Sequence, residues 1–522
     1  MANQYGRIQI FTDESEITNK NLLEVLQKAY KSHEINSAAM QELIDYEAGD
    51  VTDVRDKTFR KDVDSFVPDP LAALIVDFKC GFNWANPITL RRSDDDDPET
   101  GDEKNTAKAI SLLNQGFRAE SLKKKQQKMA RFIEICGVAY TYVDINAEWE
   151  EGDSFFTYDA FDPRTTFVVR SRAFSDNRVI LGVSYREDEF HNKYFTCFTK
   201  DYRYDTEGFE KIYDWQKNPI GKIPIIEWIR SHDRQGCFER LIPLMDDLTQ
   251  NLSDFSNDIT QNTDCVWVTT DVELKEVSQD SNGNLVESDI TPQSGDWIHI
   301  FTTPDGKTPS IKPLTVTNDY QGILNKIVDA RTHILSLAHV PQRNDDSGGS
   351  TGIAMSDAAG WTDAEAEASR EAMLADSSKM EEVKVILAAV KASPFVPAGC
   401  PLTDLLYSDV EPDIKRSKEH ELSVKTSSLS TLLAHGFSLE DCVAAISLFS
   451  DPQQVVARSG EGVKRYQEAN VYKESDTSES IGLTSDNPVN QISNSPTLDV
   501  ATTQETVDKT TGEMTSDGTE PG

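Results

Sequence analysis

The sequence has no run of 18 apolar residues, which excludes a transmembrane helix of ordinary length. Its first residues, MANQYGRIQIFTDESE, have neither a basic start nor an apolar stretch, so we expect no secretory signal there. The cysteines form no CxxC pair and are odd in number, which predicts free thiols in a reducing compartment. They are Cys80, Cys136, Cys197, Cys237, Cys265, Cys400 and Cys442. The eight histidines are scattered and show no zinc-ligand spacing.

Basic residues are scarce relative to acidic ones. The chain has 52 lysines and arginines against 89 aspartates and glutamates, a formal net charge of −37. A surface of this sign repels phosphates, which argues against ordinary nucleic-acid binding. Four consecutive aspartates at 94–97 lack the glycine that shapes a calcium loop, so we expect a solvated loop rather than a metal site.

Motifs for catalysis are absent or incomplete. Gly306-Lys307-Thr308 resembles the end of a phosphate loop, but the first glycine of that motif would fall at Phe301. The GxSxG match at 348–352 follows a polar run instead of the strand that a nucleophile elbow needs. The sequence therefore predicts a protein that is not an enzyme, with no catalytic residue, no metal and no cofactor.

Apolar residues recur with the spacing of helices in some segments and with the alternation of strands in others, which together predict an α+β fold. Residues 1–60 read as helices, with Asn36 as the cap of the second one. A helix is expected over 119–136, ended by Gly137. Alternating apolar residues then predict six short strands and a seventh in IGKIPIIEW, up to about residue 235. The six are VAYTYVDI, FFTYDAF, TTFVVRS, VILGVSY, KYFTCFT and GFEKIYDW.

An apolar stripe follows the helix that we expect at 239–265. Its members are Leu241, Met245, Leu248, Leu252, Phe255 and Ile259. Steps of four and three residues place all six on one narrow face, opposite a polar face. Pro243 is tolerated only in the first turn, so the helix should begin there.

A β-rich insert and a second striped helix come next. The insert covers 266–316 and contains the hairpin signal Asn282-Gly283. The second helix covers 317–340 and is ended by Pro341. Two long helices that flank a small β module predict a stalk that goes out, forms a tip and returns.

The rest of the chain alternates between polar and helical segments. Residues 341–352 form a glycine-rich polar loop, and 353–412 contain one very long helix and a strand. Helices are expected over 413–472. The tail, 473–522, has ten acidic residues, two lysines and no aromatic residue, so we expect it to be disordered.

Six stretches, in this order, carry a resemblance to a known family. They are QELIDYEAGD, GVAYTYVDINAEW with FFTYDAFDPRTTFVVRS, IGKIPIIEW, LIPLMDDLTQNLSDFSNDI, NDDSGGSTGIAM and SLSTLLAHGFSLEDCVAAISLFSDP. Together they resemble the portal (head–tail connector) proteins of tailed phages, of the type found in phages of Gram-positive bacteria. The resemblance covers about residues 40–472.

The resemblance implies the portal fold, with an α/β wing, long stem helices, a small β-rich clip and a helical crown. It implies these ranges: wing 61–238, descending stem helix 239–265, clip 266–316, returning stem helix 317–340, channel loop 341–352, long wing helix and strand 353–412, and crown 413–472. The stripe residues would pack the stem. The loop residues expected to face the channel are Gln342, Arg343, Asn344, Asp345, Asp346, Ser347, Gly348, Gly349, Ser350 and Thr351.

The resemblance also implies an assembly. Family members form a ring, usually of twelve subunits, at one capsid vertex, through which double-stranded DNA enters and leaves. The implied partners are the terminase, a head-completion or adaptor protein, and the major capsid and scaffolding proteins, with no membrane. The implied location is the virion, after assembly in the host bacterial cytoplasm. An acidic wall suits such a channel because a lysine-lined one would hold the DNA.

Two alternatives stay open at this point. A terminase-like enzyme would need a phosphate loop or an ordered carboxylate set. A capsid or scaffold component is the other, although a scaffold would be mostly helical and lack the strand-rich block.

Overall fold

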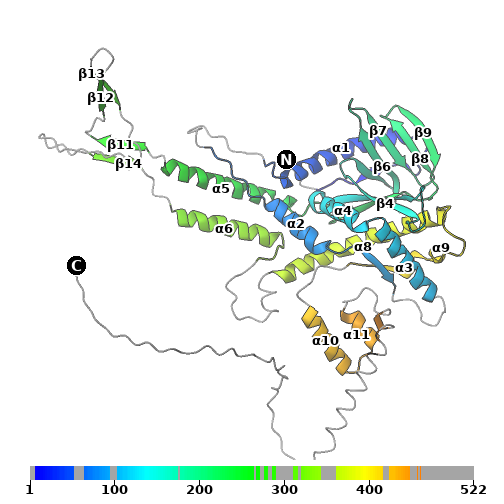
Figure 1. The fold of residues 1–522 in the computed structure, drawn as a ribbon. Helices are drawn as coiled ribbons and strands as arrows, with labels where there is room; N and C mark the ends of the chain where they lie inside the picture. Colours follow the sequence, from blue (N-terminus) through cyan, green and yellow to red (C-terminus); the bar gives the residue numbers. More distant parts are fainter. Residues whose placement is uncertain are drawn as a thin grey trace, which may run out of the picture. The chain divides into compact units, whose positions relative to one another are not determined.

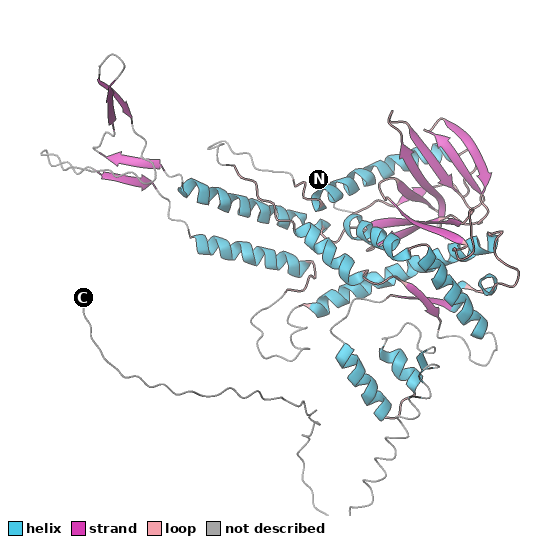
Figure 2. Ribbon diagram, in the orientation of Figure 1, coloured by secondary structure: helices cyan, strands magenta, loops and turns pink. Residues whose placement is uncertain are grey.

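The computed structural model describes residues 6–51, 64–93, 103–173, 177–263, 319–342, 360–414 and 422–446, four strands between 266 and 314, and a few residues at 455–462. The chain divides into two compact units, Met1–Gln453 and Gln454–Gly522. All elements below belong to the first unit (Figure 1). Their mixture of helices and strands confirms the α+β prediction (Figure 2). The tail predicted to be disordered lies outside the described residues.

The largest sheet has six strands in the order β1-β5-β6-β7-β8-β9. They are β1 Ile10–Thr12, β5 Thr166–Ser171, β6 Val179–Glu187, β7 Lys193–Phe198, β8 Tyr202–Glu207 and β9 Lys211–Lys217. Alternate apolar residues of these strands pack against helix α1, Leu22–Glu47, and bury Leu26, Phe167 and Phe195 in a shared core. Strands β5, β6, β7 and β9 confirm four of the predicted strands, whereas β8 was missed because its sequence, YRYDTE, has few apolar residues.

The N-terminal region differs from the prediction of helices alone. β1 pairs in parallel with β5, and α1 is one continuous helix instead of two. Asn36 is not a helix cap. It is buried in the middle of α1, where its amide donates to the Ile8 carbonyl and accepts from the Ile8 backbone N–H, both at 2.8 Å. Asparagine is favoured at helix caps because its side chain bonds nearby backbone groups. Here the Asn36 side chain bonds the backbone of a distant segment instead, so its presence did not mark the start of a helix.

A second sheet, in the order β10-β3-β4, lies against three helices. Its strands are β3 Val138–Ile145, β4 Phe156–Phe161 and β10 Ile225–Ile229, and each was predicted. The helices are α3 Glu103–Ala119, α4 Leu122–Cys136 and α8 Trp361–Ala392. Together they bury a core around Trp228, Phe156 and Ile386.

Gly137 ends α4, as predicted, in a left-handed conformation with φ of 75°. A Cβ at this position would lie 2.6 Å from the backbone of Arg234. Glycine is therefore required twice here, by its φ angle and by the close approach of a second segment.

A third, two-stranded sheet joins distant parts of the chain. β2, Thr89–Arg92, pairs antiparallel with β15, Val410–Asp413. Short turns of helix precede β15: α9 at Pro401–Asp404 and η2 at Tyr407–Asp409. Helices α10, Leu422–Ala434, and α11, Leu439–Ile446, contact each other within the region expected to be helical.

Candidate functional site: the paired helices α5 and α6

Two helices correspond to the predicted stalk. α5, Ile242–Thr263, follows the short helix η1, Glu239–Leu241, and has Pro243 in its first turn, as predicted. α6, Tyr320–Leu337, is capped by Asp319, whose Oδ1 accepts from the Gly322 backbone N–H at 3.0 Å. Figure 1 shows the two helices side by side. Lys326 Nζ donates to Asn251 Oδ1 at 2.9 Å, and the Phe255 and Tyr320 rings meet edge to face at 6.0 Å.

In the segment of the sequence that connects α5 to α6, the chain forms two small antiparallel strand pairs. β11, Val266–Thr270, pairs with β14, Ser310–Leu314, and β12, Lys275–Gln279, pairs with β13, Leu285–Asp289. The β-rich character predicted for this insert is confirmed for these strands. The Asn282-Gly283 turn itself lies outside the described residues.

The apolar stripe on α5 is buried unevenly. Leu241, Met245 and Leu248 are buried in a core shared with α2, Leu71–Asn83, and with Ile327 and Ile334 of α6. Leu252 and Phe255 are half-buried against that core, and Ile259 is 44% exposed. Burial therefore decreases from the N-terminal end of α5, where other elements surround it, toward Ile259.

The polar face of α5 has a partner that the sequence did not reveal. An extended strap, residues 64–69, runs along this face. The Ser65 N–H donates to Asn257 Oδ1 at 2.7 Å, and the Val67 N–H donates to Ser253 Oγ at 2.9 Å. Asp69 pairs with Arg331 of α6 at 3.0 Å. Asn257, on the polar face, is 2% exposed.

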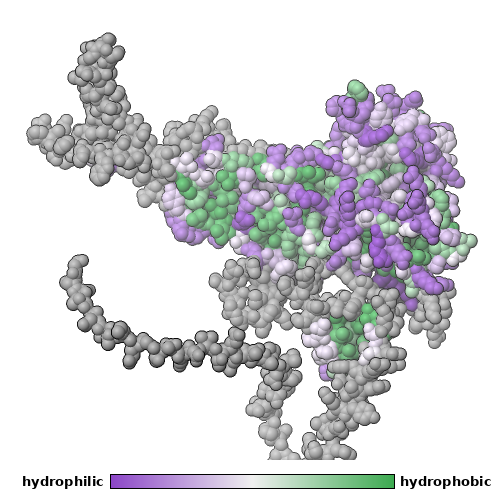
Figure 3. Space-filling view, viewed as in Figure 1, coloured by the Kyte–Doolittle hydropathy of each residue, from purple (hydrophilic) through white to green (hydrophobic). Residues whose placement is uncertain are grey.

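A set of large apolar side chains on this helix pair is partly exposed in the single subunit. It comprises Leu244 and Ile259 of α5 and Leu324, Val328 and Leu337 of α6, which are 40% to 60% exposed. Hydrophobic residues are visible over these helices in the space-filling view (Figure 3). In a chain of net charge −37, exposed apolar groups spread over two neighbouring helices indicate surfaces suited to association.

Of the predicted loop residues, the structure describes Gln342 alone. Its Nε2 donates to the Thr332 carbonyl of α6 at 2.6 Å, which joins the start of the loop to the end of that helix. Arg343, Asn344, Asp345, Asp346, Ser347, Gly348, Gly349, Ser350 and Thr351 lie outside the described residues. The helix that follows is described from Trp361, with Gly360 as its left-handed N-cap at φ of 82°.

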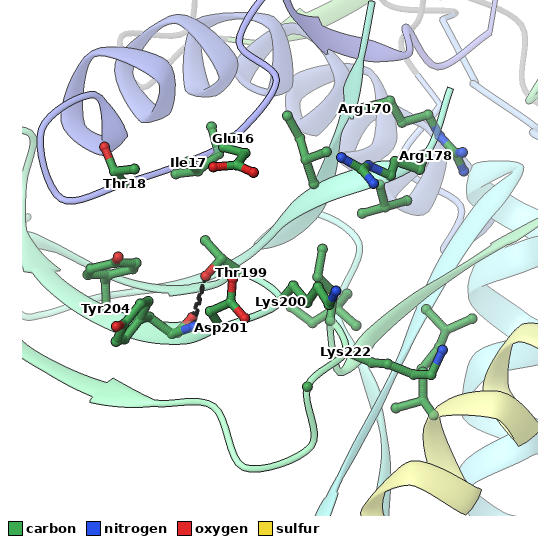
Figure 4. A pocket seen from close by; sticks show the side chains of 18 of the residues that line it. Glu16, Ile17, Thr18, Arg170, Arg178, Thr199, Lys200, Asp201, Tyr204 and Lys222 are labelled. Carbon is green, nitrogen blue, oxygen red and sulfur yellow. Dashed lines mark hydrogen bonds between the residues drawn. The ribbon is translucent and has the colours of Figure 1, made fainter. Parts of the chain in front are cut away.

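A cavity of about 970 Å³ lies between the six-stranded sheet and the segment before α1 (Figure 4). Lys200, Lys222 and Arg178 line it together with Glu16 and Asp201. None of the described residues that line this cavity is a histidine or a cysteine, so they offer no imidazole base and no thiol nucleophile. Its mixed charges favour solvent or a polar contact over one defined ligand.

An ion network closes one side of the cavity. Glu227 accepts from Arg234 at 2.6 Å and from Arg170 at 2.9 Å. Burial alone would raise the pKa of Glu227, but the two arginines outweigh it and lower the pKa to about 2. Glu227 is therefore a structural anion rather than an acid–base group.

Two further properties bear on function within the described part of the chain. No group of three or more His, Cys, Asp or Glu residues there is arranged to hold a metal ion. None of the helices described is both long and apolar enough to span a bilayer.

Comparison with known proteins gives one family and distant structural similarity. Two chains from gene transfer agent particles, in "Neck of empty GTA particle computed with C6 symmetry" and "Virion of native gene transfer agent (GTA) particle", are each 12% identical to this chain. The TM-scores are 0.39 and 0.37, with 76% and 78% of this chain and 95% and 99% of those chains covered. No curated protein matches significantly. The model of the family described as "Phage portal protein, SPP1 Gp6-like" matches residues 12–393, so this chain belongs to that family of phage portal proteins.

Proposed function

We propose that this chain is the structural subunit of a portal ring at one capsid vertex, where it forms the channel for packaging and ejection of double-stranded DNA. The observation that carries this proposal is the exposed apolar set on α5 and α6. A single subunit leaves these side chains 40% to 60% exposed, whereas a ring of side-by-side helix pairs would cover them on both sides. Burying apolar area in this way contributes about 25 cal/mol per Å².

The net charge supports a channel that does not bind its cargo. Each subunit adds −37 to the ring, and like charge repels the phosphates of a passing duplex. A basic wall would instead release counterions at every contact and hold the DNA in place. Salt screens the repulsion within about 10 Å, so it acts where the duplex comes close to the wall.

We assign the parts of the chain to the parts of a portal as follows. The assignment is wing 61–238, descending stem helix 239–265 (α5), clip 266–316, returning stem helix 317–340 (α6), channel loop 341–352, long wing helix and strand 353–412 (α8 and β15), crown 413–472 and tail 473–522. Three neighbouring apolar cores, in which α1, α4 and α8 pack against the sheets, support a rigid wing. The paired helices with strands between them support a stem and a clip.

The partners proposed for the ring follow from these assignments. The clip would dock the terminase motor during packaging and the head-completion or adaptor protein afterwards. The major capsid and scaffolding proteins would surround the wing. The subunit number proposed is twelve, and the ring is a virion component assembled in the bacterial cytoplasm.

The ring itself is tested by placing a charge on the exposed apolar set. Val328 is 60% exposed, so Val328→Asp should leave the subunit folded but should abolish or severely weaken ring formation, because assembly would bury an unpaired carboxylate. Native mass spectrometry and electron microscopy should show rings for the wild type and single subunits for the variant. Circular dichroism should be unchanged.

Ser336→Asp is the matched control for that experiment. It adds the same charge at an exposed polar position of the same helix, and rings should persist. Intact rings with Val328→Asp would contradict the proposed packing of the helix pairs.

The channel loop is tested by adding cations to it. On our proposal, Asp345→Lys together with Asp346→Lys should slow or stall DNA packaging in vitro at low salt, because each new cation adds a salt-sensitive phosphate contact. Higher salt should relieve the defect. The double variant Asp345→Asn and Asp346→Asn removes the same charges without adding cations and should package normally. Packaging at the wild-type rate by the lysine variant at low salt would show that these residues do not face the DNA.

A further inference from the structure

Five charged side chains meet in a buried cluster between the first turns of α8 and the body of the subunit. Glu367 and Glu371 come from α8, Lys79 from α2, Glu134 from α4, and Arg230 from the residue after β10. Their side chains are 0% to 16% exposed. None of these groups was singled out by the sequence, because they are spread over 293 positions of the chain and only the fold brings them together.

The contacts within this cluster are unequal. Arg230 pairs with Glu134 at 3.1 Å and with Glu367 at 2.6 Å, and Lys79 also pairs with Glu367. Glu134 accepts a further hydrogen bond from Trp84 Nε1 at 3.1 Å. Glu371 shares the same Arg230 nitrogen with Glu367, at 2.6 Å, but this contact lacks the angle of a hydrogen bond. Among the described residues, Glu134 and Glu367 therefore each accept a hydrogen bond from a cation, whereas Glu371 does not.

The charge balance of the cluster is negative by one if all three carboxyls are ionised. A buried net charge is costly, so such a site takes up a proton where that is possible. Asn83 provides a reason for the proton to reside on Glu371. Its Nδ2 donates to Glu371 Oε2 at 2.6 Å, while its buried Oδ1 has no donor. This neutral amide is the hydrogen-bond donor to Glu371 among the described residues, so Glu371 is the carboxyl of the three that is best able to hold the proton.

The cluster holds the N-terminal part of α8 in particular. Beyond the cluster, this part contacts the body through Trp361, which packs on Phe78 and Phe82, and through Ala364 and Ala368. The C-terminal part of α8 is fixed separately, by Val383, Ile386 and neighbouring residues in the main core. The two parts of the helix are therefore held by different sets of residues.

We propose that the N-terminal part of α8 is a proton-dependent joint, in which protonated Glu371 locks the helix onto α2 and α4 and loss of that proton favours its release. Residues 343–359 directly precede this joint, so on our proposed function it would connect the channel loop to the wing. The inference about the proton does not depend on that role.

The electrostatics agree with the geometry. Burial, and then the neighbouring Glu134, raise the pKa of Glu371 to about 8. Burial alone would raise the pKa of Glu367, but the positive charges of Lys79 and Arg230 outweigh burial and lower it. The other titratable groups facing the cluster are Cys237, whose pKa is raised by burial so that it stays neutral, and His339, which faces Glu367.

The sign of the pH dependence follows from linkage. In the locked state Glu371 ionises near pH 8, whereas in the released state it ionises near its ordinary value of 4.5. The lock is fully present below pH 4.5 and is lost as pH rises toward 8. Release should therefore become about tenfold more favourable per pH unit between about 5 and 8, and should level off above 8.

Hydrogen exchange with mass spectrometry on the full-length protein tests this directly. Between pH 5.5 and 7.5, after correction for the intrinsic rate, protection of residues 361–374 should fall by up to about 100-fold, which is tenfold per unit. Protection of residues 383–392 should change far less. A flat wild-type profile at 361–374 would overturn the proposal.

Three variants separate this joint from a general effect of pH. Glu371→Gln cannot ionise and should flatten the profile at 361–374. Glu134→Gln removes the second cause of the raised pKa of Glu371 but not its burial, so its profile should level off at a lower pH than that of the wild type. Glu381→Gln, at an exposed glutamate of the same helix, should keep the wild-type slope. If Glu371→Gln retained that slope, another group would carry the proton and the proposal would be wrong.

Discussion

Lys379→Met should lower the free energy of unfolding by about 3–5 kcal/mol, the cost of removing one partner from a buried ion pair. Lys379 Nζ pairs with Glu382, and the two side chains are 2% and 0% exposed. The same ammonium group lies 4.1 Å from the centre of the Phe117 ring. The variant would leave Glu382 with the Thr141 hydroxyl, 3.1 Å away, but without a cation. Chemical denaturation followed by tryptophan fluorescence measures the change.

Two further variants give this experiment its controls. Lys384→Met breaks the more exposed pair with Glu381 on the same helix and should cost less than about 1 kcal/mol. Combining Lys379→Met with Glu382→Leu removes both charges and should recover most of the lost stability. Equal denaturation midpoints for Lys379→Met and the wild type would show that the pair is not buried as described.

Leu248→Asp should also destabilise the subunit by several kcal/mol, because it places an unpaired carboxylate in a closed apolar site. Leu248 is 0% exposed and packs where α5 meets α2 and α6. We expect a lower thermal unfolding midpoint and, as a consequence, no ring. Differential scanning calorimetry checks the first effect, and native mass spectrometry checks the second.

The comparison with Val328→Asp makes this prediction specific. Both variants should lose the ring, but only Leu248→Asp should lose stability as a single subunit. Gln250→Asp is the control on the same helix, since Gln250 is exposed and the added charge remains in water. A Leu248→Asp variant as stable as Gln250→Asp would mean that the N-terminal half of α5 is not packed in an apolar core.

Local signals in the sequence predicted many of the elements correctly. The strands β3, β4 and β10 followed from period-two alternation, and the start of α5 followed from Pro243. The end of α4 followed from Gly137. In each case the cause lies within a few residues: a missing N–H, a left-handed φ angle, or one buried face of a strand.

The predicted site residues stay predictions, because they concern packing in a ring and a channel. Within the single subunit, the stripe residues Leu241, Met245 and Leu248 are buried, whereas Ile259 is 44% exposed. The spacing of apolar residues shows which face of a helix is apolar, but it does not show whether another part of the same chain covers that face. The loop prediction for residues 343–351 stays a prediction, because those residues lie outside the described part.

By itself, the sequence determined the α+β class, most strand positions, the absence of complete catalytic motifs, and, through six short stretches in order, the portal family. Only the tertiary structure decided which distant groups meet. The parallel pairing of β1 with β5, the strap on Ser253 and Asn257, and the cluster around Arg230 all join segments far apart in the chain. Such contacts produce no periodic pattern in the sequence. A polar side chain that is buried beside a distant partner cannot be distinguished, from the sequence alone, from one that is exposed to solvent.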